Sequence, residues 1–313
     1  MSVELSVNLG GLVMKNPVTV ASGTFGSGRE YAELWSASPS CPGPLNALGA
    51  ITTKGVSFEP WAGNPGIRIT ETASGMLNSI GLQNGGVEYF CSNDLVWLAS
   101  QNVPVIVNVS GHSGEEYTKV IQRLEREEAV AAYEVNISCP NVASGGMSFG
   151  TDAAAAAEVT KLCRQATKRP LLVKLTPNVT DITEIARAVE AAGADAISLI
   201  NTVAGMAIDA QKRTKVFDRG VAGLSGPAVK PVALYAVYRV YQAVDIPLLG
   251  IGGIRSACDA VEFFLAGATA VAVGTANFSD PLRALRLAEE LSAWCASEGI
   301  QDIKELRGAL KDG

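Results

Sequence analysis

One short stretch of the chain combines residue types and a spacing that could do chemistry. Residues 133–141 read as a short buried strand that ends in an amide (Asn136), a thiol (Cys139) and a second amide (Asn141). The proline after the thiol cannot donate to a sheet, so we predict that the strand ends there. The glycine-rich run at 144–150 has the composition of a flexible loop. A thiol on a rigid strand end beside such a loop can act as a base or a nucleophile, although a free cysteine can also be a small buried hydrophobe.

Polar or small residues also lie at or just beyond the ends of the other predicted strands. Amides and lysines are prominent in this set, and glycines end the last two strands. The residues are Ser22, Lys54, Asn108, Lys174, Asn201, Thr202, Gly252-Gly253 and Gly274-Thr275. Amides both donate and accept, so a ring of them fits a planar heterocycle, and lysines fit a site where negative charge resides or develops. No Asp or Glu falls at a predicted strand end, which argues against a carboxylate pair or a carboxylate metal site.

The glycines after the last two strands indicate what kind of ligand the amides and lysines would bind. Backbone N–H groups at Gly252-Gly253 and Gly274-Thr275 can bind a phosphate, because glycine permits close approach. We therefore predict a phosphorylated cofactor whose ring lies over the strand ends, with a second ring stacked on it. Lys174 would face the cofactor ring and Cys139 the substrate. The alternative is an aldolase-like enzyme in which Lys174 forms a Schiff base.

Short apolar runs alternate with segments of helical period along the chain. The runs are Val18–Ala21, Ala50–Thr53, Val105–Val109, Tyr133–Ile137, Leu171–Leu175, Ala196–Ile200, Pro247–Gly250 and Ala270–Val273. Each repeat is a strand followed by a helix, which predicts parallel strands. An open doubly wound sheet is the rival, but a closed barrel brings all the polar strand ends round one mouth. We predict an α/β fold with a single (β/α)8 barrel domain over residues 1–313 and an N-terminal β-hairpin formed by Val3–Asn8 and Leu12–Lys15.

Two connections are too long for plain loops. Ser57–Gly85 and Val203–Ser225 both leave predicted carboxyl ends of strands, so we expect both to lie at the mouth of the barrel. The second connection contains Lys212, Arg213 and Lys215. These residues either contact a ligand or form a solvated basic loop.

The composition argues against several classes of protein. Of the 313 residues, 48% are hydrophobic, which predicts a large core, and the formal net charge of −6 argues against a nucleic-acid or membrane surface. No apolar stretch approaches the roughly 18–20 residues of a membrane span. Met1–Leu5 lacks a basic-then-apolar leader, so we expect a cytoplasmic protein. The six cysteines are scattered and His112 is the single histidine, which predicts reduced thiols and no metal site.

Several short motifs, taken in order, resemble the class 1 dihydroorotate dehydrogenases, which are flavin enzymes of pyrimidine biosynthesis. The most specific motifs are 78–84 (NSIGLQN), 136–141 (NISCPN) and 174–178 (KLTPN). The motifs at 200–202, 223–227, 250–253 and 273–276 also match. The resemblance extends from Asn16 to Phe278, nearly the whole chain.

The resemblance implies FMN as the cofactor and dihydroorotate as the substrate. FMN would be held by Ser22, Lys54, Gly55, Asn108, Asn136, Lys174, Ile200, Gly226, Gly252, Gly253, Gly274 and Thr275. The substrate would be bound by Lys54, Asn78, Ser79, Ile80, Gly81, Leu82, Asn136, Asn201 and Thr202. Cys139 would be the base that takes a proton from C5 of dihydroorotate while hydride passes from C6 to N5 of FMN. Lys174 would stabilise the reduced flavin near N1.

Within class 1, residues 75–81 and 149–152 resemble the NAD-linked 1B branch more than the fumarate-using 1A branch. The 1B branch implies a catalytic homodimer that works in a heterotetramer with an electron-transfer subunit carrying FAD and a [2Fe-2S] cluster. This chain has no ferredoxin-type cysteine spacing and no dinucleotide-binding motif, so those cofactors would belong to the partner. The alternatives are a fumarate-dependent 1A enzyme, a dehydrogenase of another dihydropyrimidine and a non-catalytic flavin- or phosphate-binding barrel.

Overall fold

The structure is a computed structural model, and it describes residues 3–36, 44–138, 140–141 and 147–311. Cys139 and most of the glycine-rich run that follows it therefore lie outside the described residues. So does Cys41, one of the six cysteines.

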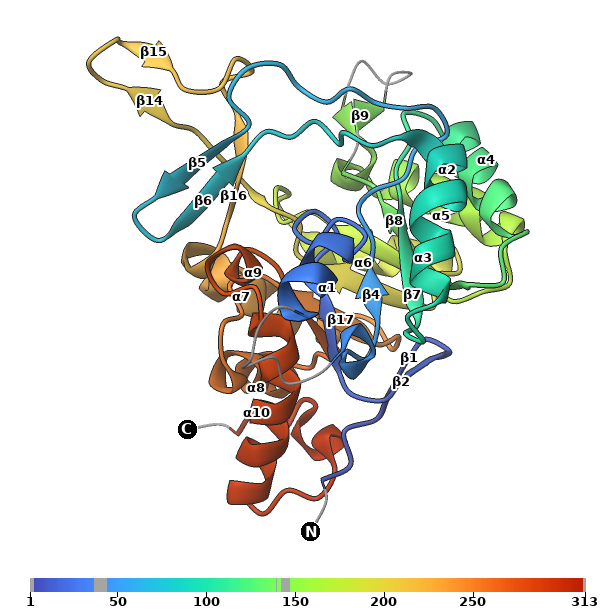
Figure 1. Cartoon of the computed structure of the whole chain (residues 1–313), viewed down its shortest axis with the longest axis vertical. Coiled ribbons are helices and arrows are strands. Elements are labelled where there is room, and N and C mark those ends of the chain that lie inside the picture. The colour runs from blue at the N-terminus through green and yellow to red at the C-terminus, as the bar shows by residue number, and fades with distance from the viewer. Residues whose placement is uncertain (1–2, 37–43, 139, 142–146, 312–313) are drawn as a thin grey trace.

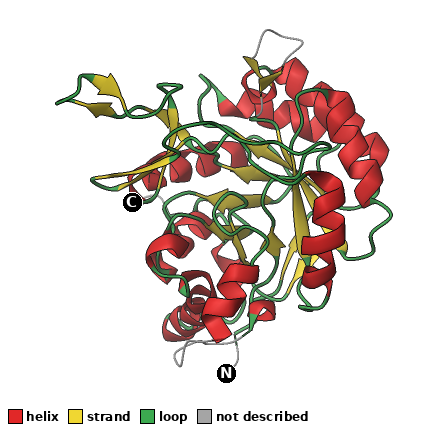
Figure 2. Ribbon diagram, turned by 45° about the horizontal axis from the view of Figure 1, so that its top comes forward, coloured by secondary structure: helices red, strands yellow, loops and turns green. Residues whose placement is uncertain are grey.

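Eight parallel strands form the centre of the fold (Figures 1 and 2). They are β3 (Val18–Val20), β4 (Ile51–Thr52), β7 (Val105–Val109), β8 (Val130–Asn136), β11 (Leu171–Leu175), β12 (Ala196–Leu199), β17 (Leu248–Ile251) and β18 (Ala270–Val273). Every residue of β7 and β11 is buried, as expected for parallel strands that are covered on both faces. The predicted runs match these strands closely, and the main difference is that β8 begins at Val130 rather than at Tyr133.

The two ends of this sheet meet, which makes it a barrel. The strand order is β3-β18-β17-β12-β11-β8-β7-β4, so the first two strands in the chain lie at its two edges. The N–H of Gly49, just before β4, donates to the carbonyl of Val18 on β3 over 3.0 Å. The hydroxyls of Thr19 and Thr52 lie 3.2 Å apart across the same seam. These contacts confirm the predicted (β/α)8 barrel and exclude the open sheet.

Helices cover the outside of the barrel, as Figure 2 shows. The α-helices are α1 (Arg29–Ser36), α2 (Gly86–Tyr89), α3 (Val96–Ala99), α4 (Gly114–Leu124), α5 (Ala153–Ala166), α6 (Ile182–Ala191), α7 (Lys230–Tyr241), α8 (Ala257–Leu265), α9 (Ala276–Ser279) and α10 (Arg283–Ser297). A π-helical segment, Phe90–Leu95, joins α2 to α3, and short 3-10 turns lie at Leu45–Ala47, Phe149–Thr151, Pro227–Val229 and Ile303–Leu306.

Side-chain caps fix where several of these helices begin. Asp152 accepts the N–H of Ala155 at the start of α5 over 2.8 Å, and Asp181 accepts the N–H of Thr183 at the start of α6 over 2.9 Å. Each cap sets the point at which the chain turns back along the barrel after a strand.

A second sheet covers the carboxyl ends of the barrel strands. It is antiparallel, with the order β13 (Val203–Gly205), β16 (Ala222–Ser225), β6 (Gly75–Asn78) and β5 (Ile69–Thr72), and we call it the mouth sheet. Its strands come from the two long connections that we expected at the mouth. A small hairpin, β14 (Ile208–Asp209) and β15 (Thr214–Lys215), projects from it with the predicted basic residues (Figure 1).

The predicted N-terminal hairpin is present but short, with β1 (Val7–Leu9) paired to β2 (Leu12–Met14). Gly10 in its turn has φ +62° and packs against the backbone of Asp195, just before β12 begins. The hairpin therefore lies at the amino ends of the barrel strands, away from the mouth sheet (Figure 1). One further pair, β9 (Pro140–Asn141) and β10 (Met147–Ser148), follows β8. Across the described residues, no helix has both the length and the apolar character to cross a bilayer.

Candidate active site

A cavity of about 450 Å³ lies between the carboxyl ends of the barrel strands and the mouth sheet. It is lined by every residue that we predicted to bind FMN or the substrate and that the structure describes, whereas Asn141 is not part of the lining. The predicted residues that line it are Ser22, Lys54, Gly55, Asn78, Ser79, Ile80, Gly81, Leu82, Asn108, Asn136, Lys174, Ile200, Asn201, Thr202, Gly226, Gly252, Gly253, Gly274 and Thr275. Cys139 lies outside the described residues, but Ser138, which precedes it, is part of the lining. The roles of these residues stay predictions, while their convergence on one cavity is a finding.

Three neighbouring strands each contribute one buried polar side chain to the cavity. Asn108 on β7, Asn136 on β8 and Lys174 on β11 are 1%, 6% and 5% exposed. Lys174 is the register partner of Asn136, so the two side chains start from the same level of the barrel. The hydroxyl of Tyr117 on α4 donates to the carbonyl of Asn136 over 2.6 Å and holds the end of β8. The arrangement is a rigid wall of two amides and one ammonium.

A carboxylate that the sequence analysis missed lies directly behind this wall. Glu134 is 0% exposed, and its Oε2 accepts a hydrogen bond from Asn108 Nδ2 over 2.5 Å. The same oxygen lies 3.8 Å from Lys174 Nζ, which also donates to Ser22 Oγ over 3.3 Å. The prediction that no carboxylate faces the site concerned strand ends only, whereas Glu134 precedes the end of β8 by two residues. The period of two along a strand gives Glu134 and Asn136 the same face, and that signal was available in the sequence.

Amides and hydroxyls connect the carboxyl ends of β8 and β12 at the cavity. Asn201 Nδ2 donates to Ser138 Oγ over 2.8 Å and to Asn136 Oδ1 over 3.3 Å. The carbonyl of Thr202 accepts from Asn178 Nδ2 over 2.9 Å. This network ties the residue next to Cys139 to the end of β12.

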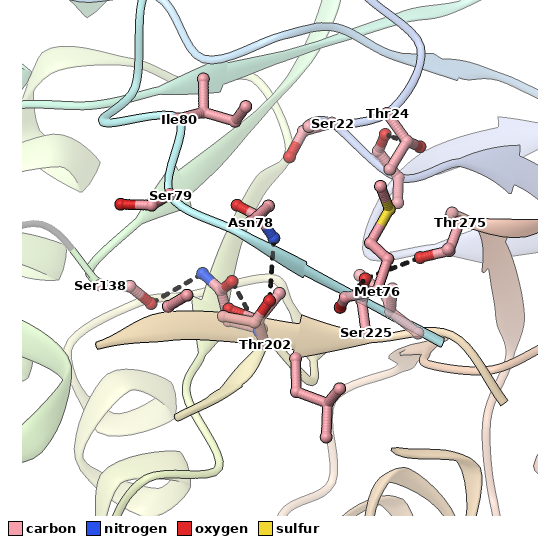
Figure 3. A pocket seen from close by; sticks show the side chains of 18 of the residues that line it. Ser22, Thr24, Met76, Asn78, Ser79, Ile80, Ser138, Thr202, Ser225 and Thr275 are labelled. Carbon is pink, nitrogen blue, oxygen red and sulfur yellow. Dashed lines mark hydrogen bonds between the residues drawn. The ribbon is translucent and has the colours of Figure 1, made fainter. Parts of the chain in front are cut away.

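The mouth sheet closes the cavity from the opposite side, as Figure 3 shows. Asn78, the last residue of β6, donates through Nδ2 to the carbonyl of Gly223 on β16 over 3.2 Å. The segment 79–82 then runs along the cavity edge, with Gly81 at φ +71° and Leu82 at φ +54°. Trp61, in the same connection, packs against His112 in the loop after β7, with ring centroids 4.0 Å apart and the ring planes tilted by 32°. The segment is therefore anchored at both the sheet and the barrel.

Lys54 supplies a second positive charge, and it is half-buried. Burial lowers the pKa of Lys54 below the ordinary lysine value, the positive charge of Arg68 lowers it further, and Glu30 opposes the shift. Within the described residues, no carboxylate forms an ion pair with Lys54. This amine is therefore available to an anionic ligand in the cavity.

Small residues follow the last two barrel strands. Together with Gly226, the residues Gly253, Gly274 and Thr275 form a group that we call the cradle. Gly226 and Gly253 have φ angles of +90° and +74°, which favour glycine. In the described part of the chain, no hydrogen-bond acceptor is found for the N–H groups of Gly253, Gly274 and Thr275. Ser225 Oγ and Thr275 Oγ1 lie 2.8 Å apart and join the cradle to the mouth sheet (Figure 3). Free backbone donors beside glycine are the usual way that a protein binds a phosphate.

The dihydroorotate dehydrogenase family model matches residues 4–294, most of the chain. The chain belongs to the dihydroorotate dehydrogenase family. Membership favours the redox prediction over the aldolase-like alternative, and it accounts for a barrel whose polar strand ends face a second sheet.

Relatives in the dihydroorotate dehydrogenase family are similar along nearly their whole length. The chain is 54% identical over 309 residues to the "Dihydroorotate dehydrogenase B (NAD(+)), catalytic subunit" of Desulforamulus reducens, with 99% of each chain covered. It is 54% identical to the subunit of the same name from Geotalea daltonii, with 98% of each covered. A solved DHODH from Eimeria tenella, in complex with ferulenol, has a TM-score of 0.79 over 98% of this chain and 88% of that chain. At 21% identity, that likeness supports the fold alone.

Proposed function

We propose that this chain is the FMN-containing catalytic subunit of an NAD-linked dihydroorotate dehydrogenase. It would oxidise dihydroorotate to orotate in pyrimidine biosynthesis. The observation that carries the proposal is the single cavity in which Asn108, Asn136 and Lys174 face the mouth strand that bears Asn78. Curated relatives more than 50% identical over almost the whole chain carry the corresponding name.

The cavity fits FMN. The N–H groups of Gly253, Gly274 and Thr275, which have no acceptor among the described residues, suit its phosphate. The wall of Asn108, Asn136 and Lys174 suits a planar ring with alternating donors and acceptors. Bound FMN would accept hydride from the substrate. A cavity of about 450 Å³ lies within the range of small-molecule and cofactor sites, roughly 300–1,000 Å³.

The substrate would lie between this wall and the mouth sheet. Lys54 and the polar groups of Asn78–Leu82 would bind its carboxylate and ring edges, while Asn201 and Thr202 would bind the opposite edge. Oxidation removes a hydride from C6 and a proton from C5. We assign the proton to Cys139, which follows Ser138 at the cavity and which the lysine charges would help to ionise.

We propose a partner that carries the electrons onward. The relatives are named catalytic subunits, which implies at least one other subunit in those proteins. We infer a homodimer of this chain that binds two electron-transfer subunits with FAD and a [2Fe-2S] cluster. Among the described residues, no group of three or more His, Cys, Asp or Glu side chains could hold a metal ion, and Cys91, Cys163, Cys258 and Cys295 are free. Free thiols fit a reducing compartment, and we place the protein in the cytoplasm.

Orotate formation tests the proposal. The purified chain, supplied with an artificial electron acceptor, should convert dihydroorotate to orotate, which is followed by its ultraviolet absorbance. It should leave dihydrouracil unchanged, because that ring lacks the carboxylate that Lys54 would bind. Denaturation should release FMN, identified by mass. A chain that contains FMN but oxidises dihydrouracil in preference to dihydroorotate would contradict the substrate assignment.

A further inference from the structure

Glu134 has no part in the proposed function, yet it contacts two residues that do. It is fully buried on the inner face of β8. A carboxylate in a protein interior is strongly unfavourable unless its charge is paired and hydrogen-bonded. An apolar side chain of similar volume would fill a purely structural position at least as well. The presence of an acid at this level of the barrel therefore requires another explanation.

One oxygen of Glu134 makes both contacts. Oε2 accepts from Asn108 Nδ2 at 2.5 Å and lies 3.8 Å from Lys174 Nζ. Among the described residues, no other carboxylate forms an ion pair with Lys174. Glu134 Oε1 is buried and has no hydrogen-bond partner in the same part of the chain. The polar contacts of the carboxylate are therefore with residues of the cavity wall.

These contacts fix the orientation of both wall residues. Because Nδ2 of Asn108 donates to Glu134, the amide is held with Oδ1 on the side of Gly55, which lines the cavity. The ammonium of Lys174 is held between Glu134 and Ser22. Without the carboxylate, the amide would be free to turn over, and the ammonium would lose its anionic neighbour.

We propose that Glu134 is a positioning residue that orients Asn108 and Lys174 and, by offsetting the Lys174 charge, lowers the reduction potential of the bound flavin. The inference rests on the proposed function. Reduction adds negative charge to the flavin, so a nearby positive charge makes reduction easier and a nearby negative charge makes it harder. A lower potential would favour transfer of the electrons to the next acceptor once the substrate has been oxidised.

Glu134→Gln tests the proposal because the amide keeps the shape and an oxygen that accepts from Asn108 but loses the charge. We expect the midpoint potential of bound FMN, measured by anaerobic titration with reference dyes, to move to more positive values. Ser198→Ala is the matched control. Ser198 is buried on β12 as the register partner of Lys174, and its hydroxyl has no hydrogen-bond partner in the described structure. The midpoint potential of FMN bound to the Ser198→Ala variant should equal that of FMN bound to the wild type. An unchanged or more negative potential in Glu134→Gln would overturn the proposal.

Glu134→Asp provides a second test if the Gln variant does not fold. It keeps the charge but withdraws the carboxylate by one methylene, so the potential should stay near the wild-type value. The FMN dissociation constant, followed by flavin fluorescence, should rise by about tenfold because Asn108 and Lys174 lose their fixed partner. Wild-type FMN affinity in this variant would contradict the positioning role. A wild-type chain that binds no flavin would instead refute the proposed function, so the two failures are distinguishable.

Discussion

Lys54 brings an ammonium group to the cavity without a carboxylate partner among the described residues. Because burial lowers its pKa, Lys54 loses its charge at a lower pH than the ordinary lysine value of 10.5. An anionic ligand needs the charged form, so its affinity should fall as the pH rises through this lowered pKa. Under the proposed function, the protonation state of Lys54 would therefore set the alkaline limit of substrate binding.

The pH dependence of orotate binding checks this expectation. We expect the affinity, measured from the change in flavin absorbance, to decline on the alkaline side at a pH below 10.5. In Lys54→Arg the guanidinium remains charged. That variant should bind orotate more weakly but should not show the same alkaline decline. An identical decline in both proteins would assign the titration to another group.

The proposed role of Cys139 gives a second prediction at this scale. Cys139→Ala should retain FMN but lose reduction by dihydroorotate at neutral pH, because loss of a general base slows proton removal by about 10²–10⁴-fold. Stopped-flow absorbance of the flavin measures the rate. Cys258→Ala, which removes an exposed thiol on α8, should react as the wild type does. Wild-type reduction of the Cys139 variant would show that another residue takes the proton.

The chemistry-bearing residues were largely predictable from the sequence because strand ends are easy to find. Asn108, Asn136 and Lys174 each lie near the carboxyl end of a predicted strand, and parallel strands place such ends together. Glu134 was missed because only strand-end positions were predicted to face the cavity, and Glu134 precedes the end of β8 by two residues. Its contacts depend on side chains from three strands.

At the scale of elements, the mouth sheet is the part that sequence patterns did not predict. Its strands pair across long separations, as in Asn78 of β6 with Gly223 of β16, and half of β5 is exposed. Short strands with mixed exposure lack the apolar alternation that predicts a strand. The connections were placed correctly at the mouth, since they leave the carboxyl ends of barrel strands.

Gly223 shows how closely the mouth sheet approaches Thr202, one of the residues that we predict to bind the substrate. A Cβ at this position would collide with the side chain of Thr202. Gly223→Ala should therefore displace Thr202 and raise KM for dihydroorotate about tenfold, equivalent to ~1.4 kcal/mol, while FMN content stays unchanged. Ala204→Ser changes the exposed register partner on β13 and serves as the control. Steady-state kinetics with an artificial acceptor measure the effect. An unchanged KM would show that Thr202 does not contact the substrate.

At the scale of the whole molecule, one closed barrel explains why residues from Ser22 to Thr275 share a cavity. β3 pairs with β18, and the seam between β3 and β4 closes the ring, so Gly274 at the end of the last strand lies against Ala21 at the end of the first. The polar residues at the ends of the predicted strands favoured this closure over an open sheet. What the chain alone did not reveal is the surface that would meet a partner, because exposed residues carry little pattern.

The two-subunit proposal predicts how the isolated chain behaves toward NAD. Without a partner, the purified protein should be reduced by dihydroorotate but should not form NADH at an appreciable rate. Addition of an FAD- and iron–sulfur-containing subunit from the same host should restore NADH formation, followed by its absorbance. Rapid NADH formation by the isolated chain would contradict the proposal that a second subunit transfers the electrons to NAD.

Anaerobic mixing of the purified, flavin-containing chain with dihydroorotate tests the central claim most directly. We predict that the visible flavin absorbance is lost in a single turnover and that one orotate appears for each flavin reduced. An oxidised flavin spectrum that persists with excess dihydroorotate would contradict the account.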